Sequence, residues 1–133
     1  MPTKITNEAA AAMLTALGNL VSGGSLKIYS GTVPATAATA LSDQVKLFED
    51  SWSAAAYSSV SNNVMTMDHS QLSAQAVADG DASFYRVETS LGATRWQGTV
   101  GTSDANLIVD SVAFTTGGVV TILGWTVTHP LGA

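Results

Sequence analysis

The residues of this chain that most often carry chemistry are its two histidines and their polar neighbours. His69 stands between Asp68 and Ser70, which are the residue types of a hydrolytic triad. A triad needs an exposed nucleophile on a sharp turn and an oriented base, and the sequence has no GxSxG or comparable turn. His129 lies far along the chain, and neither histidine has the HExxH spacing of a zinc site. We therefore expect no catalytic residue and no enzymatic activity.

Two short glycine-containing stretches resemble parts of ligand-binding loops. Asp79-Gly80-Asp81 has the first residues of a calcium loop, but the later ligands and the terminal glutamate are missing. Gly117-Gly118 precedes a predicted strand, whereas a phosphate-binding glycine loop opens a helix. The chain has no cysteine, which excludes disulfides and thiolate metal sites. We read both stretches as turns and expect no metal and no cofactor.

The three tryptophans allow a binding interpretation and a structural one. Trp52, Trp96 and Trp125 would form a carbohydrate platform if two of them lay coplanar in one open groove. Tryptophans are more often core or interface residues, because each buries a large apolar area. The structural interpretation is therefore favoured, and exposure of these rings discriminates between the two.

The element around which the chain is organised is a predicted β-hairpin over residues 82–101. Two runs of aromatic and β-branched residues flank Leu91-Gly92, which is typical of a hairpin. With a two-residue loop, the cross-strand pairs are Tyr85–Gly98, Val87–Trp96 and Glu88–Arg95. Leu-Gly is a poor type I′ turn, so a three-residue loop with a bulge is the alternative.

Alternation along this hairpin predicts one buried face and one polar face. The face fit for burial carries Tyr85, Val87, Trp96 and Val100. The opposite face carries Phe84, Arg86, Glu88, Arg95 and Gln97. Gly98 would lie under the Tyr85 ring, which offsets the weakness of a glycine within a strand.

A helix is predicted before the first strand. Thr6 or Asn7 can cap it, Glu8 suits its first turn, and Gly23-Gly24 ends it. At 100° per residue, its apolar stripe consists of Ile5, Ala9, Met13, Ala16, Leu17 and Leu20. We expect this stripe to pack on the sheet of the same chain, with the groove of a partner as the alternative. The apolar run is too short to span a membrane.

Further strands at about ten-residue spacing predict a mainly β fold. They cover residues 25–30, 44–49, 57–60, 64–68, 107–114 and 119–129. The expected fold is an antiparallel β-sandwich or barrel with one N-terminal amphipathic helix. We expect a single domain over residues 1–133, with a helix region over 1–24 and a β domain over 25–133.

An extended loop over residues 31–43 interrupts this β domain. It consists mostly of small residues around Pro34 and has no periodicity. A loop of this length without secondary structure is usually functional or disordered. It either lies as an arm on a neighbouring subunit or is merely mobile.

Charge is scarce in this chain and negative in sum. Charged residues make up 11% of the sequence, and ten acidic residues against five basic ones give a net charge of −5. Average globular domains carry about 25% charged residues. A hydroxyl-rich surface or coverage in an assembly would each explain the shortage. The scattered basic residues exclude a DNA-binding patch, so we expect no nucleic-acid partner.

The order of several segments resembles a family of small virion structural proteins of tailed bacteriophages. These segments are NLVSGGSLKIYSGTVPATAATAL after the helix, SFYRVETSLGATRWQGTVG, SDANLIVDSVAF and a closing VTILGWTVTHP. The resemblance covers nearly the whole chain. Its motifs are compositional rather than catalytic, and it supplies no catalytic residues.

This resemblance implies a capsid decoration, or cement, protein that clamps adjoining major capsid subunits. It would be made in the host cytoplasm and reside on the exterior of the virion head. The expected partners are the major capsid protein and further copies of the chain, as a homotrimer or a dimer. The alternative is a tail, neck or fibre-associated module that binds carbohydrate. Our candidate assembly contacts are Thr32, Val33, Pro34, Arg86, Glu88 and Arg95.

Overall fold

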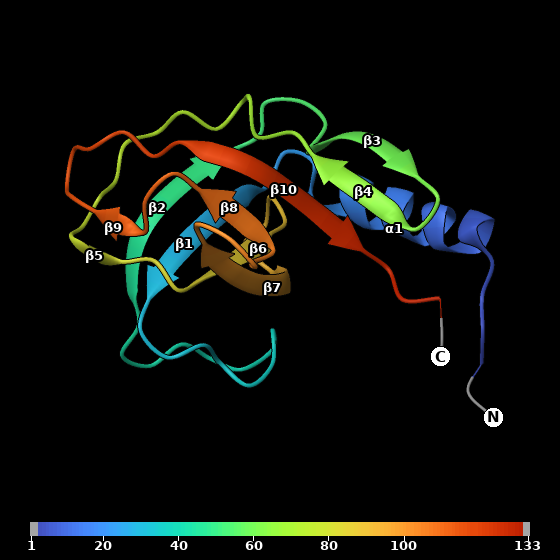
Figure 1. Ribbon diagram of the computed structural model, residues 1–133, viewed down its shortest axis with the longest axis horizontal. Helices are drawn as coiled ribbons and strands as arrows, with labels where there is room; N and C mark the ends of the chain where they lie inside the picture. Colours follow the sequence, from blue (N-terminus) through green and yellow to red (C-terminus); the bar gives the residue numbers. More distant parts are fainter. Residues whose placement is uncertain (1–2, 132–133) are drawn as a thin grey trace.

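A strongly curled sheet that forms half a barrel dominates the computed structural model, which describes residues 3–131 (Figure 1). Its strands are β1 (Ser25–Ser30), β2 (Val45–Ser51), β3 (Tyr57–Ser61), β4 (Val64–Met67), β6 (Phe84–Glu88), β7 (Thr94–Gly101), β8 (Leu107–Val109) and β10 (Ile122–Thr128). Their order in the sheet is β2-β1-β6-β7-β8-β10-β4-β3. Every neighbouring pair is antiparallel except β7 and β8. The mainly β class with one N-terminal helix is confirmed.

A second, two-stranded sheet lies at the end of the molecule far from the helix (Figure 1). It joins β5 (Gly80–Asp81) to β9 (Ala113–Phe114). The stretch expected as one strand over residues 107–114 is therefore divided between two sheets. Its first part, β8, pairs with β10 as expected, and its last part, β9, does not. Residues 110–112 separate the two parts and let the chain change direction.

The central hairpin forms from β6 and β7 with the bulged loop that was the alternative expectation. Tyr85 pairs with Gly98 and Val87 with Trp96, as predicted. The register then shifts, and Glu88 faces Thr94 instead of Arg95. The cause is Gly92, whose φ of +87° closes a three-residue loop with a bulge. The predicted Glu88–Arg95 pair is therefore wrong.

The helix α1 (Asn7–Val21) packs on β3 and β4 of its own sheet. Thr6 caps it, because the Thr6 hydroxyl accepts a hydrogen bond of 3.1 Å from the Ala9 amide. Its buried residues are Ala10, Leu14, Gly18 and Val21. The predicted stripe is wrong by about 100°, the rotation of a single residue. Met13 and Leu20, which the stripe places inside, are 48% and 49% exposed.

Gly18 explains which helix face is buried. A side chain at Gly18 would collide with the Tyr57 ring and with the sulfur of Met65. The backbone of α1 therefore approaches β3 and β4 more closely than a face bearing Met13 and Leu20 would allow. The Tyr57 hydroxyl donates a hydrogen bond of 2.8 Å to the Asn19 side chain, which fixes the helix against this edge.

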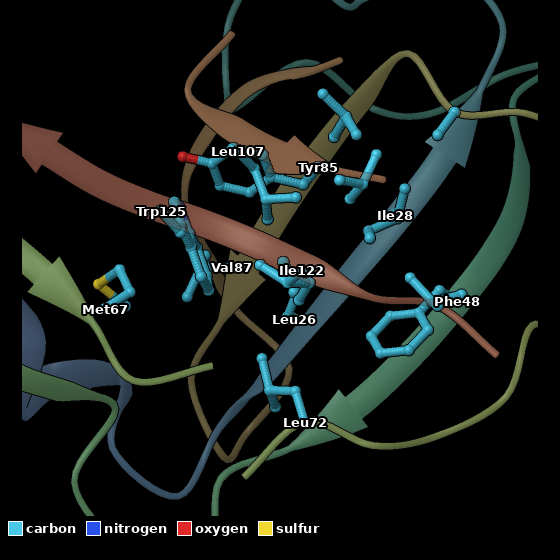
Figure 2. Packing of buried hydrophobic residues seen from close by; sticks show 14 of the residues in the cluster. Leu26, Ile28, Phe48, Met67, Leu72, Tyr85, Val87, Leu107, Ile122 and Trp125 are labelled. Carbon is cyan, nitrogen blue, oxygen red and sulfur yellow. The ribbon is translucent and has the colours of Figure 1, made fainter. Parts of the chain in front are cut away.

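The main core fills the concave side of the half-barrel. Figure 2 shows Ile122 and Trp125 of β10 facing Leu26 and Ile28 of β1 and Val87 of β6. Each of these side chains is less than a tenth exposed. Tyr85 packs edge-on against Trp125, with ring centroids 5.2 Å apart. Strands distant in sequence thus share one apolar interior, which is the main source of stability in such a fold.

Candidate functional site

Residues 31–44, which we name the strap, form the long connection between β1 and β2. In Figure 1 the strap is the cyan-to-teal loop that extends below the sheet. It folds back onto the β6–β7 hairpin of its own chain. The side-chain amide of Gln97 donates a hydrogen bond of 2.8 Å to the carbonyl oxygen of Pro34. Arg86 donates to the carbonyl oxygens of Thr36 and Thr39, at 3.3 and 2.6 Å.

Arg86 holds the strap as a buried cation. The residue is 5% exposed, and its Nε donates to the Gln97 side-chain oxygen at 3.1 Å. No carboxylate within residues 3–131 lies at ion-pair distance from it. A buried guanidinium needs acceptors for its hydrogens, and the strap carbonyls supply them. The strap therefore covers Arg86 and Gln97, which lie on the hairpin face predicted to be polar.

A turn inside the strap presents these carbonyls. The Thr39 amide donates 3.1 Å to the Thr36 carbonyl, and the two threonine hydroxyls are 2.8 Å apart. Gln44 closes the base of the strap through a hydrogen bond of 2.7 Å to the Thr32 carbonyl. Outward from this framework, Val33 and Leu41 are exposed. The strap thus has a fixed inner side, and two apolar side chains are exposed on it.

The structure separates the six candidate assembly contacts into two groups. Thr32, Val33 and Arg95 are exposed, and their role as contacts stays a prediction. Pro34, Arg86 and Glu88 are buried within the chain. A partner reaches these three residues only if the strap or the hairpin moves.

Glu88 belongs to a row of charges that runs across β6, β1 and β2. Its carboxylate lies 3.0 Å from the Lys27 ammonium group, which is also 3.8 Å from Glu49. Lys46 pairs with Glu49 at the end of the row. Burial lowers the pKa of Lys27, but the hydrogen bond and charge of Glu88, together with Glu49, outweigh it and raise the pKa above 10.5. The hydrogen bond from Lys46 lowers the pKa of Glu49.

A recess of about 240 Å³ opens beside this row, between the hairpin tip and the end of α1. Lys27, Glu49 and Glu88 line one side of it, and Gly23 and Gly24 line the other. Both carboxylates already have lysine partners of the same chain. Within the described residues, no three His, Cys, Asp or Glu side chains gather into a group that could hold a metal ion.

The tryptophans form part of the core rather than an open platform. Trp52 and Trp125 are each 2% exposed and stack on each other, with ring centroids 5.8 Å apart. The Trp52 ring nitrogen donates to the Asp68 carbonyl at 2.8 Å. Trp96 is half-buried and donates to the Tyr85 hydroxyl at 3.3 Å. The coplanar exposed pair on which the carbohydrate hypothesis depends is therefore not formed.

Two further carboxylates that could carry chemistry, those of Asp68 and Asp79, accept structural hydrogen bonds. The Asp68 carboxylate accepts from the Ser70 amide and hydroxyl and from the Gln71 side chain, and these bonds lower the pKa of Asp68. The Asp79 carboxylate accepts from the Thr116 amide and hydroxyl, at 2.7 and 2.9 Å. The pKa of Asp79 is lowered for that reason.

Two features of this surface were missed by the sequence analysis. One is the binding of the strap by Arg86 and Gln97, which brings together segments far apart in sequence. The other is Leu91, which is 95% exposed at the hairpin tip. Turn positions are usually polar or glycine. A leucine between Ser90 and Gly92 is therefore the sequence signal for an exposed apolar side chain at this turn.

Comparison with known proteins found no match: no protein family, no curated protein and no solved structure matches this chain. Among the described residues, the single helix does not have the length and hydropathy needed to cross a bilayer.

Proposed function

We propose that this chain is a bacteriophage virion structural protein that decorates the outer surface of the head and clamps adjoining major capsid subunits. The observation that carries the proposal is a charge-poor chain with large apolar side chains on its exterior. Within residues 3–131, nine large hydrophobic side chains are exposed, among them Val33 and Leu41 on the strap. Charge is depleted where proteins contact one another permanently, and large exposed apolar groups favour such contacts.

Two further points support the location on the head exterior. The net charge of −5 would be repelled by packaged DNA on the inside of a shell. The segments that follow the helix resemble those of small phage virion proteins. Clamping requires contact area, about 1,000 Å² or more for a stable interface, and no chemistry.

The outer side of the strap is the surface that we assign to the capsid. It projects from the sheet, is fixed from beneath by Arg86 and Gln97, and presents Val33 and Leu41 outward. A preorganised loop loses little conformational entropy when it binds. The carbohydrate alternative has no comparable support, because Trp52 and Trp125 are buried.

Binding to empty phage heads tests this assignment. The double variant Val33→Ser, Leu41→Ser changes only exposed apolar side chains, so it should fold normally and bind heads about tenfold or more weakly. Leu123→Ser, which alters an exposed leucine on β10, is the matched control and should bind like the wild type. Co-sedimentation with purified empty heads measures the difference. Equal binding by all three proteins would contradict the assignment of the strap.

A further inference from the structure

The most exposed large apolar side chain within residues 3–131 lies on a hydrogen-bonded hairpin tip. Leu91 is 95% exposed between β6 and β7. Thr89 fixes the loop around it, because its carbonyl accepts from the Gly92 amide at 2.9 Å and its hydroxyl accepts from the Leu91 and Ala93 amides. No apolar neighbour within residues 3–131 covers this leucine.

A small cavity lies near the other end of the sheet, beside β9. It has a volume of about 160 Å³, and its floor consists of the buried side chains of Ala76, Phe114 and Val120. Asp110, Ser111 and Thr115 add polar groups to the lining, and the space is open to solvent. Its volume is close to that of cavities that take up a molecule of the size of benzene, so its apolar floor has room for one side chain such as a leucine.

The cavity is formed in the free chain. Ala76 and the turn at Gly117 and Gly118 are joined by two backbone hydrogen bonds of 2.9 and 2.8 Å. Val119, 79% exposed, and Asp110 stand at the rim. An apolar floor with a partly polar rim has the arrangement of the centre of a protein–protein contact.

Leu91 cannot reach the cavity of its own chain. The hairpin tip borders the same recess as Gly23 and Gly24, at the end of α1. The cavity is lined by residues of β9, and β9 lies at the opposite end of the molecule from α1 (Figure 1). The length of β1, about 20 Å, separates these two ends of the sheet.

The charges beside the two features are complementary. Arg95 is exposed near the tip, and no carboxylate within residues 3–131 pairs with it. Asp110 is exposed at the rim of the cavity and likewise has no cation of residues 3–131 at ion-pair distance. A tip that entered the cavity of a second molecule would bring the basic group of one copy toward the acidic group of the other.

We propose that copies of this chain associate head to tail, with Leu91 of one copy seated in the cavity formed by Ala76, Phe114 and Val120 of the next, and with Arg95 facing Asp110. The two halves of this contact are different surfaces, so repetition produces a closed ring or an open chain rather than a symmetric pair. The inference does not depend on where on a virion the protein resides. One small contact of this kind is weak alone and gains strength when copies are arrayed on a surface.

Sedimentation of purified protein over a range of concentrations tests the contact. The wild type should form species larger than a dimer as its concentration rises. Leu91→Asn should weaken association about tenfold to a hundredfold, the effect of losing one buried leucine. Leu123→Asn removes another exposed leucine outside the contact and should leave association unchanged. Because both positions are exposed, both variants should keep the wild-type urea midpoint.

Charge reversal tests the orientation of the contact. Arg95→Asp and Asp110→Arg should each weaken association, and the double variant should recover it. A wild type that stays monomeric at about 1 mM, or a Leu91→Asn variant that associates as the wild type does, would overturn the proposal. Failure of the double variant to recover would overturn the pairing of Arg95 with Asp110.

Discussion

At the scale of single residues, several polar side chains of this protein hold loops together through hydrogen bonds. Asp68 is the clearest case. Its carboxylate accepts from Ser70 and Gln71, and Gln71 in turn accepts from the Ser53 and Ala54 amides and donates to the Ala55 carbonyl. One carboxylate thus ties the chain that follows β4 to the chain that follows β2. The same bonds stabilise its ionised form.

This arrangement predicts a loss of stability in acid. The pKa of Asp68 lies below 3.8 in the folded chain, chiefly because of the hydrogen bond from the Ser70 hydroxyl and then that from Gln71. A lowered pKa contributes stability that is present above 3.8 and is lost as the pH falls through the folded value. Asp68→Asn should therefore flatten the fall of the urea midpoint between about pH 5 and about pH 2. Parallel curves for variant and wild type would contradict this role.

Among the cross-strand pairs predicted in the hairpin, Tyr85–Gly98 is confirmed and Glu88–Arg95 is wrong. The close approach of the Tyr85 ring to Gly98 was predictable, because a strand glycine opposite an aromatic residue indicates such contact. The Glu88–Arg95 pair was not, because the bulge beside Gly92 changes the register after Val87. Instead Glu88 pairs with Lys27, a partner that only the order of the strands reveals.

At the scale of elements, the helix separates what sequence can predict from what it cannot. Its limits and its Thr6 cap follow from local signals. Its buried face does not, because two apolar stripes compete, one with Met13 and Leu20 and one with Leu14 and Gly18. The second stripe is buried since Gly18 lets the backbone lie against Tyr57 and Met65. Hydrophobicity alone favours Met13 and Leu20, which the structure leaves exposed.

Substitutions on the two helix faces should change the free energy of unfolding by very different amounts. Leu14→Ala leaves a cavity beneath the helix and should lower the free energy of unfolding by about 2–5 kcal/mol. Leu20→Ala, the matched change on the exposed face, should alter it by less than about 0.5 kcal/mol. Urea denaturation of both variants measures the difference. A larger loss for Leu20→Ala would restore the stripe predicted from sequence.

The strap is the element that sequence describes least well. It lacks periodicity. Its position depends on hydrogen bonds from Arg86 and Gln97, which lie 47 and 63 residues beyond the strap carbonyls that they bind. The sequence analysis left it as an arm on a neighbour or a mobile loop. The structure places it on its own hairpin, and whether it also contacts a neighbour stays a prediction.

Removal of Arg86 should release the strap. Arg86→Met preserves much of the side-chain volume but leaves the Thr36 and Thr39 carbonyls without their donor. Global stability is a poor readout here, since the cost of burying a charge disappears as well. Hydrogen exchange of amides in residues 31–44 is direct and should accelerate about tenfold or more. Arg95→Met, the exposed control, should leave it unchanged, and unchanged exchange in Arg86→Met would show that other contacts hold the strap.

At the scale of the whole molecule, a half-barrel with an apolar interior carries an exterior that is also poor in charge. The interior explains stability, but Leu91, Val119 and Leu123 on the outside contribute nothing to it. A free-standing protein gains no folding stability from such residues and risks aggregation. An assembled protein uses exposed apolar residues, such as Leu91 and Val119, for contacts. This contrast is the physical basis for the proposed structural role.

The copy number of the chain in purified virions tests that role most directly. A decoration protein follows the lattice of the head, so its copy number should be comparable to that of the major capsid protein. If the chain is a virion protein, as proposed, quantitative mass spectrometry of purified virions that contain it, with labelled reference peptides from both proteins, provides the ratio. The proposed function predicts a ratio near that of the major capsid protein. A ratio tens of times lower would place the protein in the tail or neck and contradict capsid decoration.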